Sequence, residues 1–247
     1  MLGFGFGPWG RRRRRFSPAS LFANGEQGAW YDPGDSASLF EDAAGTVPAS
    51  LNGPVGRIAD KSGRGNHAVQ AVAAARPLLR EDASGKRYLE FDGVDDRLSA
   101  AGMSLAHPWD RVSAIRQVAW MNAARIFGNG SGATLTGLLY QNQAVMGLSL
   151  FDTAAAAGNT GAAIGAKAVV TERRNGAASQ IAVGSAAPTT GHPGSTAANG
   201  VTIGADPGGG SAASLAFYGL VLVKPPLGAA ALANLRSWLA ARSGAGL

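Results

Sequence analysis

The chain has 247 residues, of which 46% are hydrophobic, enough to fill a core and to argue against global disorder. It contains no cysteine, which excludes disulfide scaffolds, thiol nucleophiles and cysteine zinc sites. The formal net charge is +6, but five of the 22 basic residues form the run Arg11 to Arg15, and without it 17 basic residues face 16 acidic ones. A nucleic-acid-binding domain carries positive charge across a face, so nucleic acid is not an expected partner.

Residues 1–16 form a segment of their own, in which glycine alternates with aromatic residues before the arginines. Alternating glycine makes ordering of this segment alone costly in entropy. Its aromatic and basic side chains are of the types that anchor protein–protein contacts. They are Phe4, Phe6, Trp9, Arg11, Arg12, Arg13, Arg14 and Arg15. We expect an extended arm that docks on another protein; the alternative is an unstructured basic tail.

Neither a secretory leader nor a membrane span is expected. The arginines follow the first apolar residues, whereas a secretory signal has its positive charge first. The longest apolar run, residues 215–223, is far shorter than the ~20 residues that a membrane-spanning helix needs.

The predicted elements begin with a short helix, with Ser17 as N-cap, Pro18 as first helical residue and Asn24-Gly25 as the stop. Most of the remaining chain alternates apolar and polar residues or has short apolar runs bounded by turns, which is typical of strands. The predicted strands are residues 87–91, 117–121, 134–140, 144–151, 168–174, a following strand ending at Val183, 201–204 and 215–223. Apart from the strand at 201–204, residues 153–165 and 184–214 are predicted to run as loops.

Two further local signals complete the predicted fold. Asn175-Gly176 tolerates the positive φ angles of a type I′ turn, which predicts a hairpin. Residues Leu232, Leu235, Trp238 and Leu239 form one apolar stripe, and Gly244 is a C-terminal cap, so a helix is expected there. Many closely spaced strands with one terminal helix predict an all-β sandwich over residues 17–247, preceded by the arm of residues 1–16.

Three stretches together resemble a known family. They are residues 28–33 (GAWYDP), 60–68 (DKSGRGNHA) and 89–96 (LEFDGVDD). They resemble bacteriophage and prophage virion proteins with a concanavalin A-like (laminin-G-like) jelly-roll domain, over about residues 20–243. Residues 16–22 also resemble phage tail-fibre or minor structural proteins. The resemblance implies an adhesion or structural module on a virion, without a fixed ligand.

Catalysis has one candidate pair of carboxylates. Retaining glucanases of this fold use two carboxylates on one strand face, and Glu90 and Asp92 share a face by period two. Gly93 interrupts the strand, however, and Val94, Asp95 and Asp96 stand where a second glutamate is expected. A turn with side chains capping backbone amides is the favoured interpretation. The chain also lacks a nucleophile elbow, a phosphate loop and a dinucleotide fingerprint, so we expect no enzyme and no cofactor.

Calcium is the metal for which the sequence offers ligands, through hard oxygen atoms. The candidates are Asp60, Asn66, Asp92, Asp95 and Asp96. Their spacing matches no contiguous calcium loop, so Asx-turn capping is the favoured role. The histidines His67, His107 and His192 are too far apart to indicate zinc.

Two aromatic residues are candidates for stacking on sugar rings. Trp109 lies in a loop-like stretch between Pro108 and Asp110 and is expected to be exposed, and Tyr31 is the second candidate. The other tryptophans within apolar patterns, Trp30, Trp120 and Trp238, are expected in the core.

The functional hypothesis is a non-enzymatic virion structural protein: a tail fibre, spike or minor tail protein. Its arm would attach it to other virion proteins, and its lectin-like sandwich would bind a host-surface glycan. A homo-oligomer is expected, with a trimer favoured by analogy with phage fibres. The alternatives are a glycan-hydrolysing depolymerase that uses Glu90 and Asp92, and a purely structural decoration or connector protein.

Overall fold

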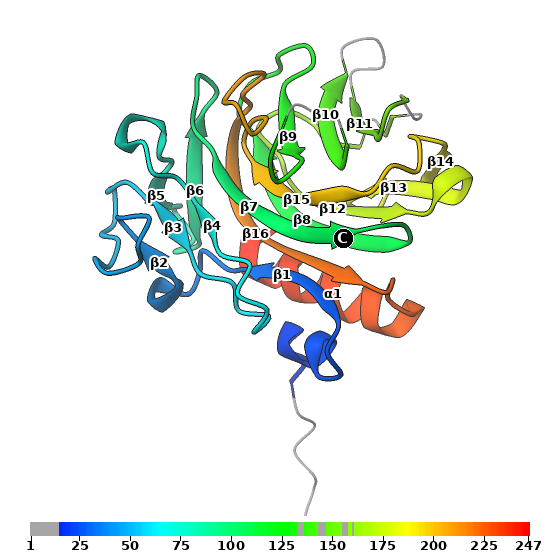
Figure 1. Cartoon of the computed structure of the whole chain (residues 1–247), viewed down its shortest axis with the longest axis horizontal. Helices are drawn as coiled ribbons and strands as arrows, with labels where there is room; N and C mark the ends of the chain where they lie inside the picture. The colour runs from blue at the N-terminus through cyan, green and yellow to red at the C-terminus, as the bar shows by residue number, and fades with distance from the viewer. Residues whose placement is uncertain (1–14, 133–135, 143–146, 155–157, 160) are drawn as a thin grey trace, which may run out of the picture.

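The computed structural model describes residues 15–132, 136–142, 147–154, 158–159 and 161–247. In this part of the chain the strands form two eight-stranded sheets that pack as a β-sandwich (Figure 1). Neighbouring strands are antiparallel throughout both sheets. The predicted all-β sandwich with a C-terminal helix is confirmed, whereas residues 1–14 of the predicted arm lie outside the described residues.

The first sheet has the strand order β14-β13-β12-β8-β16-β6-β5, and β1 pairs with β16. Its strands are β1 (Gln27–Tyr31), β5 (Leu78–Glu81), β6 (Arg87–Asp92), β8 (Trp109–Gln117), β12 (Lys167–Arg174), β13 (Ser179–Val183), β14 (Thr189–Gly191) and β16 (Ser214–Lys224).

The second sheet has the strand order β11-β10-β9-β15-β7-β4-β3-β2. Its strands are β2 (Leu39–Phe40), β3 (Arg57–Ile58), β4 (Ala68–Val69), β7 (Leu98–Leu105), β9 (Arg125–Gly128), β10 (Leu138–Asn142), β11 (Gly147–Phe151) and β15 (Ala198–Ile203).

One α-helix and four short 3₁₀-helices accompany the sheets in the described residues. They are α1 (Ala229–Ser243), η1 (Pro18–Phe22), η2 (Ser36–Ser38), η3 (Ala73–Ala75) and η4 (Gly176–Ala178). The predicted N-terminal helix is η1, and the side chain of Ser17 caps it by accepting from the backbone N–H of Ala19. None of the described helices is both long and apolar enough to cross a membrane.

The strand β16 is buried on both faces, which explains its unbroken apolar sequence. One face packs in the core between the sheets, and the other packs under α1. The pairing of β16 with β8 shifts register between Phe217 and Gly219, so Leu220 and Leu222 continue the inner face begun by Phe217. Gly219 has a φ of +150°, and a Cβ there would lie 3.1 Å from the carbonyl oxygen of Tyr31 in the neighbouring strand β1.

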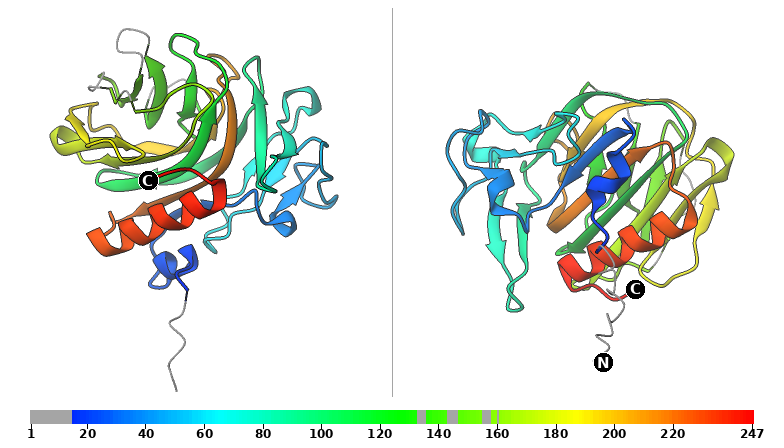
Figure 2. Two further views of the ribbon diagram at one scale, coloured as in Figure 1. Left: turned by 180° about the vertical axis from the view of Figure 1, so that it is seen from behind. Right: turned by 90° about the horizontal axis from the view of Figure 1, so that it is seen from below.

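The helix α1 lies against the outer face of the first sheet, with η1 beside it (Figure 2). Within α1, the side chains of Leu235 and Leu239 are fully buried against the sheet. Leu232 and Trp238 pack against the same hydrophobic cluster but are only half-buried. The helix ends as predicted, because Gly244 adopts a φ of +77° and donates its N–H to the carbonyl of Ala240. The expectation that Trp238 belongs to the core therefore holds only in part.

The hairpin β12–β13 is present, but its turn is not type I′. Asn175 has φ −151° and ψ 49°, outside the left-handed region, and η4 lengthens the connection. The turn is instead held by a hydrogen bond from the Asn175 N–H to Ser179 Oγ and one from the Gly176 N–H to His107 Nδ1. These contacts, one local and one with the distant His107, override the preference of the Asn-Gly pair.

Several strand predictions need correction. The predicted strand at 117–121 is wrong beyond Gln117, where β8 ends. Trp109 and Asp110, where the sequence indicated a loop, are the first two residues of β8. Residues 184–214, predicted as loop apart from a strand at 201–204, contain β14, and β15 already begins at Ala198. The residues in these strands are mostly small, so they pair with neighbouring strands without giving a strong apolar signal in the sequence.

Candidate functional site: a basic pocket beside the C-terminal helix

A pocket of about 660 Å³ lies beside the C-terminal end of α1. It is lined by Arg15 and Phe16 before η1, by the β5–β6 hairpin, by Tyr218 of β16, and by Trp238 and Arg242 of α1. We call this cavity the α1 pocket. Its volume falls within the range of ~300–1,000 Å³ typical of small-ligand sites.

The lining of the α1 pocket is strongly basic. Arg15, Lys86, Arg87 and Arg242 contribute to it, against one acidic residue, Glu81. The resulting excess of positive charge favours an anionic ligand over a cationic one.

These basic side chains differ in how far their charges are compensated. Arg242 Nη2 donates to Asp32 Oδ2 at 2.9 Å, and Arg87 Nε lies 3.4 Å from Glu81 Oε2. Lys86 Nζ donates instead to the carbonyl oxygen of Ala241 at 3.1 Å, a neutral acceptor. Within the described residues neither Lys86 nor Arg15 forms an ion pair, so both charges remain available to a ligand.

Aromatic rings form the apolar part of the α1 pocket. The half-buried Trp238 packs edge-on against Trp30, with ring centroids 5.7 Å apart, and the Arg242 guanidinium lies 5.2 Å from its ring centroid. These contacts hold the indole ring in one orientation. Tyr218 donates its hydroxyl to Asp82 Oδ2 at 3.3 Å, and burial together with the Asp82 charge raises the pKa of Tyr218 to about 12.

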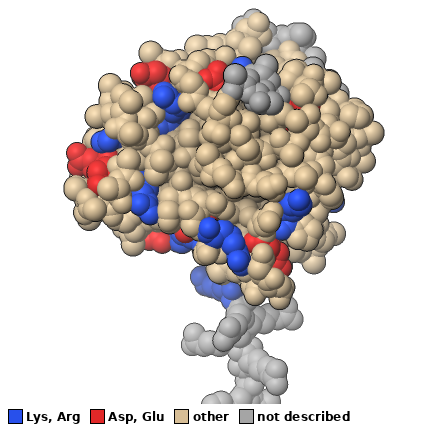
Figure 3. All heavy atoms as spheres, viewed as in Figure 1, with Lys and Arg blue, Asp and Glu red and all other residues tan. Residues whose placement is uncertain are grey.

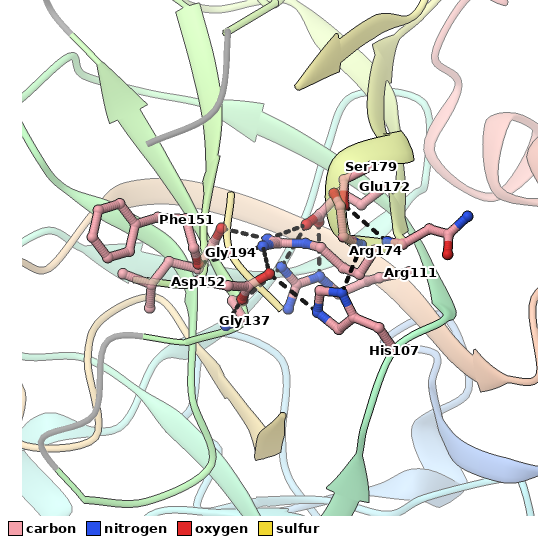
Figure 4. A network of polar contacts seen from close by, with 12 residues as sticks. His107, Arg111, Gly137, Phe151, Asp152, Glu172, Arg174, Ser179 and Gly194 are labelled. Atoms are coloured by element: carbon pink, nitrogen blue, oxygen red, sulfur yellow. Dashed lines mark hydrogen bonds and ion pairs between the residues drawn. The ribbon is translucent and has the colours of Figure 1, made fainter. Parts of the chain in front are cut away.

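A second group of charged side chains is buried inside the sandwich (Figure 4). Arg111 of β8 donates from Nε and Nη2 to the two carboxylate oxygens of Glu172 on β12, both at 2.7 Å. Arg174, also on β12, donates to Glu172 Oε2 at 2.9 Å and to Asp152 Oδ2 at 2.8 Å. His107 Nε2 lies 3.3 Å from the same Asp152 oxygen.

This buried network joins the two sheets. Arg111 Nη2 donates to the carbonyl oxygen of Gly137, and Asp152 accepts a hydrogen bond from the Gly137 backbone N–H. Burial tends to raise the pKa of Asp152, but the Arg174 charge and the hydrogen bonds from His107 and Gly137 outweigh it and lower the pKa. Because its two arginines match its two carboxylates and the side chains are buried, we assign the network a structural role.

Both sugar-stacking candidates of the sequence are buried, so these predictions are wrong. Trp109 is 0% exposed and is not in a loop but at the start of β8, where the guanidinium carbons of Arg111 and Arg174 lie 5.6 and 5.5 Å from its ring centroid. Tyr31 is also 0% exposed, and its hydroxyl donates to the carbonyl oxygen of Asn66 at 2.6 Å. The pairing of Trp109 with Arg174 on the neighbouring strand β12, which is far from it in sequence, is what the local pattern could not indicate.

The five calcium candidates fall into two groups with different roles. Asp60 accepts hydrogen bonds from the backbone N–H groups of Trp30, Ser62 and Asn66, at 2.9, 2.9 and 3.0 Å. Asn66 donates its side-chain N–H to the carbonyl oxygen of Gly28. The contact with Ser62 is the Asx turn predicted as the alternative to calcium, and the contacts with Trp30 and Gly28 lock the 60–68 turn onto β1. His67 takes part too, by accepting from the Asp60 N–H.

The second group is Asp92, Asp95 and Asp96, which place one carboxylate oxygen each within 4.8 Å of one another. Asp92 Oδ1 accepts from the Val94 N–H, and Asp96 Oδ2 accepts from the Asp92 N–H, as expected for a turn. Burial, helped by the charges of Asp92, Asp95 and Glu90, raises the pKa of Asp96 to about 6. The structure brings these three together but keeps Asp60 and Asn66 in their own turn.

The candidate catalytic pair is engaged elsewhere. Glu90 Oε2 accepts from Arg80 Nε at 2.7 Å, and Asp92 belongs to the turn just described. Neither residue lines the α1 pocket. Of the anchoring residues, Phe4, Phe6, Trp9 and Arg11 to Arg14 lie outside the described residues, and Arg15 lines the α1 pocket.

Neither the α1 pocket nor the buried network was predicted from the sequence. Lys86 and Arg87 follow a tight turn and resemble ordinary solvated charges, so no local signal marks the pocket. The network did leave a signal: by period two, Glu172 and Arg174 continue the face of Ala168 and Val170, which point into the core. Charges on a core-facing row indicate a buried polar network.

No protein-family model matches the chain, and no curated protein matches it. Solved structures do share its fold. An arabinofuranosidase complexed with arabinofuranosyl-alpha-1,2-xylobiose matches with a TM-score of 0.66 and 12% identity, covering 92% of this chain and 65% of that chain. A Trypanosoma rangeli sialidase in complex with sialic acid matches with a TM-score of 0.53 and 14% identity, covering 89% of this chain and 33% of that chain.

A mutant of the same sialidase displaying trans-sialidase activity matches with a TM-score of 0.54 and 13% identity. This chain thus spans just under two thirds of the arabinofuranosidase and one third of the sialidase. At identities this low, the likeness establishes a shared sandwich architecture and nothing finer.

Proposed function

We propose that the protein is a non-enzymatic carbohydrate-binding β-sandwich and that the α1 pocket is its sugar-binding site. The observation that carries this proposal is the α1 pocket itself, where the half-buried ring of Trp238 lies beside Lys86 and Arg15, two cations that form no ion pair within the described part of the chain. Aromatic rings pack against the C–H faces of sugars, and charged donors hydrogen-bond their polar groups. The architecture shared with an arabinofuranosidase and with sialidases supports a carbohydrate ligand.

The absence of catalysis is part of this proposal. A glycosidase of the common type needs two carboxylates on opposite sides of the scissile bond. Among the described lining residues Glu81 is the one carboxylate, and Arg87 pairs with it. Glu90, the candidate nucleophile, is tied to Arg80. These contacts favour binding over hydrolysis by a depolymerase.

We further propose that the protein is a bacteriophage virion component: a tail fibre, spike or minor tail protein that contacts host-surface glycans. The resemblance of residues 28–33, 60–68 and 89–96 to virion proteins supports this. The arm would dock on other virion proteins, and the assembly would be a homo-oligomer, with a trimer favoured.

Sugar binding is tested with the purified full chain and polysaccharide from the host surface. We expect binding without shortening of the polysaccharide, and we expect Trp238→Leu to weaken binding. Trp120→Leu is the matched control, because Trp120 is also half-buried but does not line the α1 pocket. Equal binding by all three proteins would remove the α1 pocket as the site. Cleavage that is abolished by Glu90→Gln would establish the depolymerase alternative.

The arm is tested in particles, by replacing Phe4, Phe6 and Trp9 with Ala, which leaves the α1 pocket lining unchanged. We expect the copy number in purified particles to fall, because the aromatic anchors are lost. A variant that assembles at the normal copy number would show that these residues are not the anchor.

A further inference from the structure

The α1 pocket brings together several basic side chains that are far apart in the sequence. Outside the Arg11–Arg15 run, basic and acidic residues nearly balance, at 17 and 16. Yet Lys86, Arg87 and Arg242 meet at one cavity with Glu81, and Arg15 adds a further cation. Figure 3 shows several basic side chains, with a few acidic ones, near the point where the N-terminal segment leaves the molecule, and a broad uncharged surface above them.

Two contacts decide how much of this charge a ligand can use. The buried carboxylate of Asp32 lies behind the lining and forms ion pairs with Arg242 and Lys61, at 2.9 and 3.5 Å. It therefore compensates Arg242. The Lys86 ammonium rests on the Ala241 carbonyl at the C-terminal end of α1, where the helix supplies only about half a negative charge. Lys86 and Arg15 thus leave the pocket between one and two positive charges in excess.

The aromatic part of the α1 pocket indicates that the anion is carried by a larger molecule. Phe16, Tyr218 and Trp238 all line the cavity, and its volume of about 660 Å³ far exceeds what an inorganic anion occupies. Trp238 is held by Trp30 and Arg242, so its ring is in place before a ligand binds. A sugar ring packed on such a surface buries its C–H face while its polar groups reach the cations.

The size of the charge excess matches one acidic group on the sugar. A phosphate group carries about −1.5 to −2 near neutral pH, whereas a carboxylate carries −1. Either group largely neutralises an excess of between one and two positive charges, whereas a neutral sugar leaves that excess uncompensated. The charge of the pocket therefore favours an acidic sugar over a neutral one.

We propose that the α1 pocket selects an acidic sugar, with its carboxylate or phosphate group beside Lys86 and Arg15 and the sugar ring against Trp238. This inference rests on the proposed carbohydrate-binding function and names the class of sugar that the same site recognises.

The experiment compares three matched tetrasaccharides by isothermal titration calorimetry with the full chain. One contains glucuronic acid, the second is the same molecule with its carboxyl group reduced to an alcohol, and the third carries a 6-phosphate on the reduced scaffold. We expect the glucuronic acid probe to bind about tenfold more tightly than the reduced probe at low salt. The preference should shrink in 0.5 M NaCl, where charges are screened over a few ångströms.

Lys86→Gln tests the assignment of the carboxylate. It should weaken binding of the glucuronic acid probe by about threefold to fivefold, the size of one half-exposed ion pair, and leave the reduced probe unaffected. Lys224→Gln makes the same change at the end of β16, outside the α1 pocket, and should alter neither affinity. Melting temperatures of both variants confirm that they are folded.

The outcomes separate this inference from the function on which it rests. Equal affinity for the acidic and reduced probes overturns the inference but leaves sugar binding intact. Whichever of the glucuronic acid and 6-phosphate probes binds more tightly identifies the acidic group that the pocket takes, and a preference for either of them over the reduced probe supports the inference. Binding of neither the probes nor the host polysaccharide overturns both the inference and the proposed function.

Discussion

Replacing Glu172 with Gln tests whether the buried network holds the two sheets together. Glu172 is 0% exposed and accepts three hydrogen bonds, two from Arg111 at 2.7 Å and one from Arg174 at 2.9 Å. Glutamine is nearly the same size, so the substitution removes the negative charge and one acceptor while leaving the packing almost unchanged. Two buried guanidinium groups would then share the single carboxylate of Asp152.

The expected loss in the free energy of unfolding follows from the burial of the charged side chains. Breaking a buried ion pair by removing one partner costs about 3–5 kcal/mol, because the remaining charge stays desolvated. Asp152 still compensates Arg174, so we expect Glu172→Gln to lower the free energy of unfolding by about 3 kcal/mol, the lower end of that range. Glu90→Gln is the matched control: its pair with Arg80 is about a third exposed on both sides, and such pairs contribute about 0–1 kcal/mol.

Urea unfolding followed by tryptophan fluorescence and circular dichroism measures both variants against the unmodified chain. The slope of the transition should stay constant, so that a shift in midpoint reports stability alone. If Glu172→Gln and Glu90→Gln both fall within about 1 kcal/mol of the unmodified protein, the network contributes no more than a surface pair and the reasoning is refuted.

Three further predictions concern the helix and two carboxylates. Leu239→Ala should lower the free energy of unfolding by about 2–4 kcal/mol in urea titrations, and Leu232→Ala by half of that or less, since only Leu239 is fully buried; equal losses would contradict the packing of α1. The pKa of Asp96 is raised to about 6, so its protonated form stabilises the fold below about pH 4, and that contribution is lost as the pH rises through 6. Asp96→Asn should therefore reduce the drop in melting temperature between pH 4.5 and 7.5, and an unchanged drop would count against the raised pKa. Burial tends to raise the pKa of Asp82, but the hydrogen bond from Lys167 and the backbone hydrogen bonds outweigh it and lower this pKa to about 2. The ionised Asp82 therefore stabilises the fold above about pH 4, and that contribution is lost as the pH falls toward 2. Asp82→Asn should flatten the acid limb of the stability curve between these pH values; a limb as steep as that of the unmodified chain would contradict this.

Local patterns in the sequence determined much of the secondary structure. The alternation over residues 87–91 predicted β6, the apolar run over 215–223 predicted β16, and Gly244 marked the end of α1. Each of these signals comes from residues that are close together in the sequence. They therefore act through backbone preference and through the burial of one face, which depend little on the rest of the fold.

Only the tertiary structure decided where the charges and aromatic rings meet. Lys86 and Ala241 are 155 positions apart, Asp32 and Arg242 are 210 apart, and Arg111 and Glu172 are 61 apart. No periodicity joins such residues, because their contact depends on how strands pair and on which sheet face α1 covers. Trp109 illustrates the difference: its neighbours Pro108 and Asp110 indicated a loop, while the pairing of β8 with β12 placed it in the core. A binding site built from such contacts takes shape only when the sandwich closes.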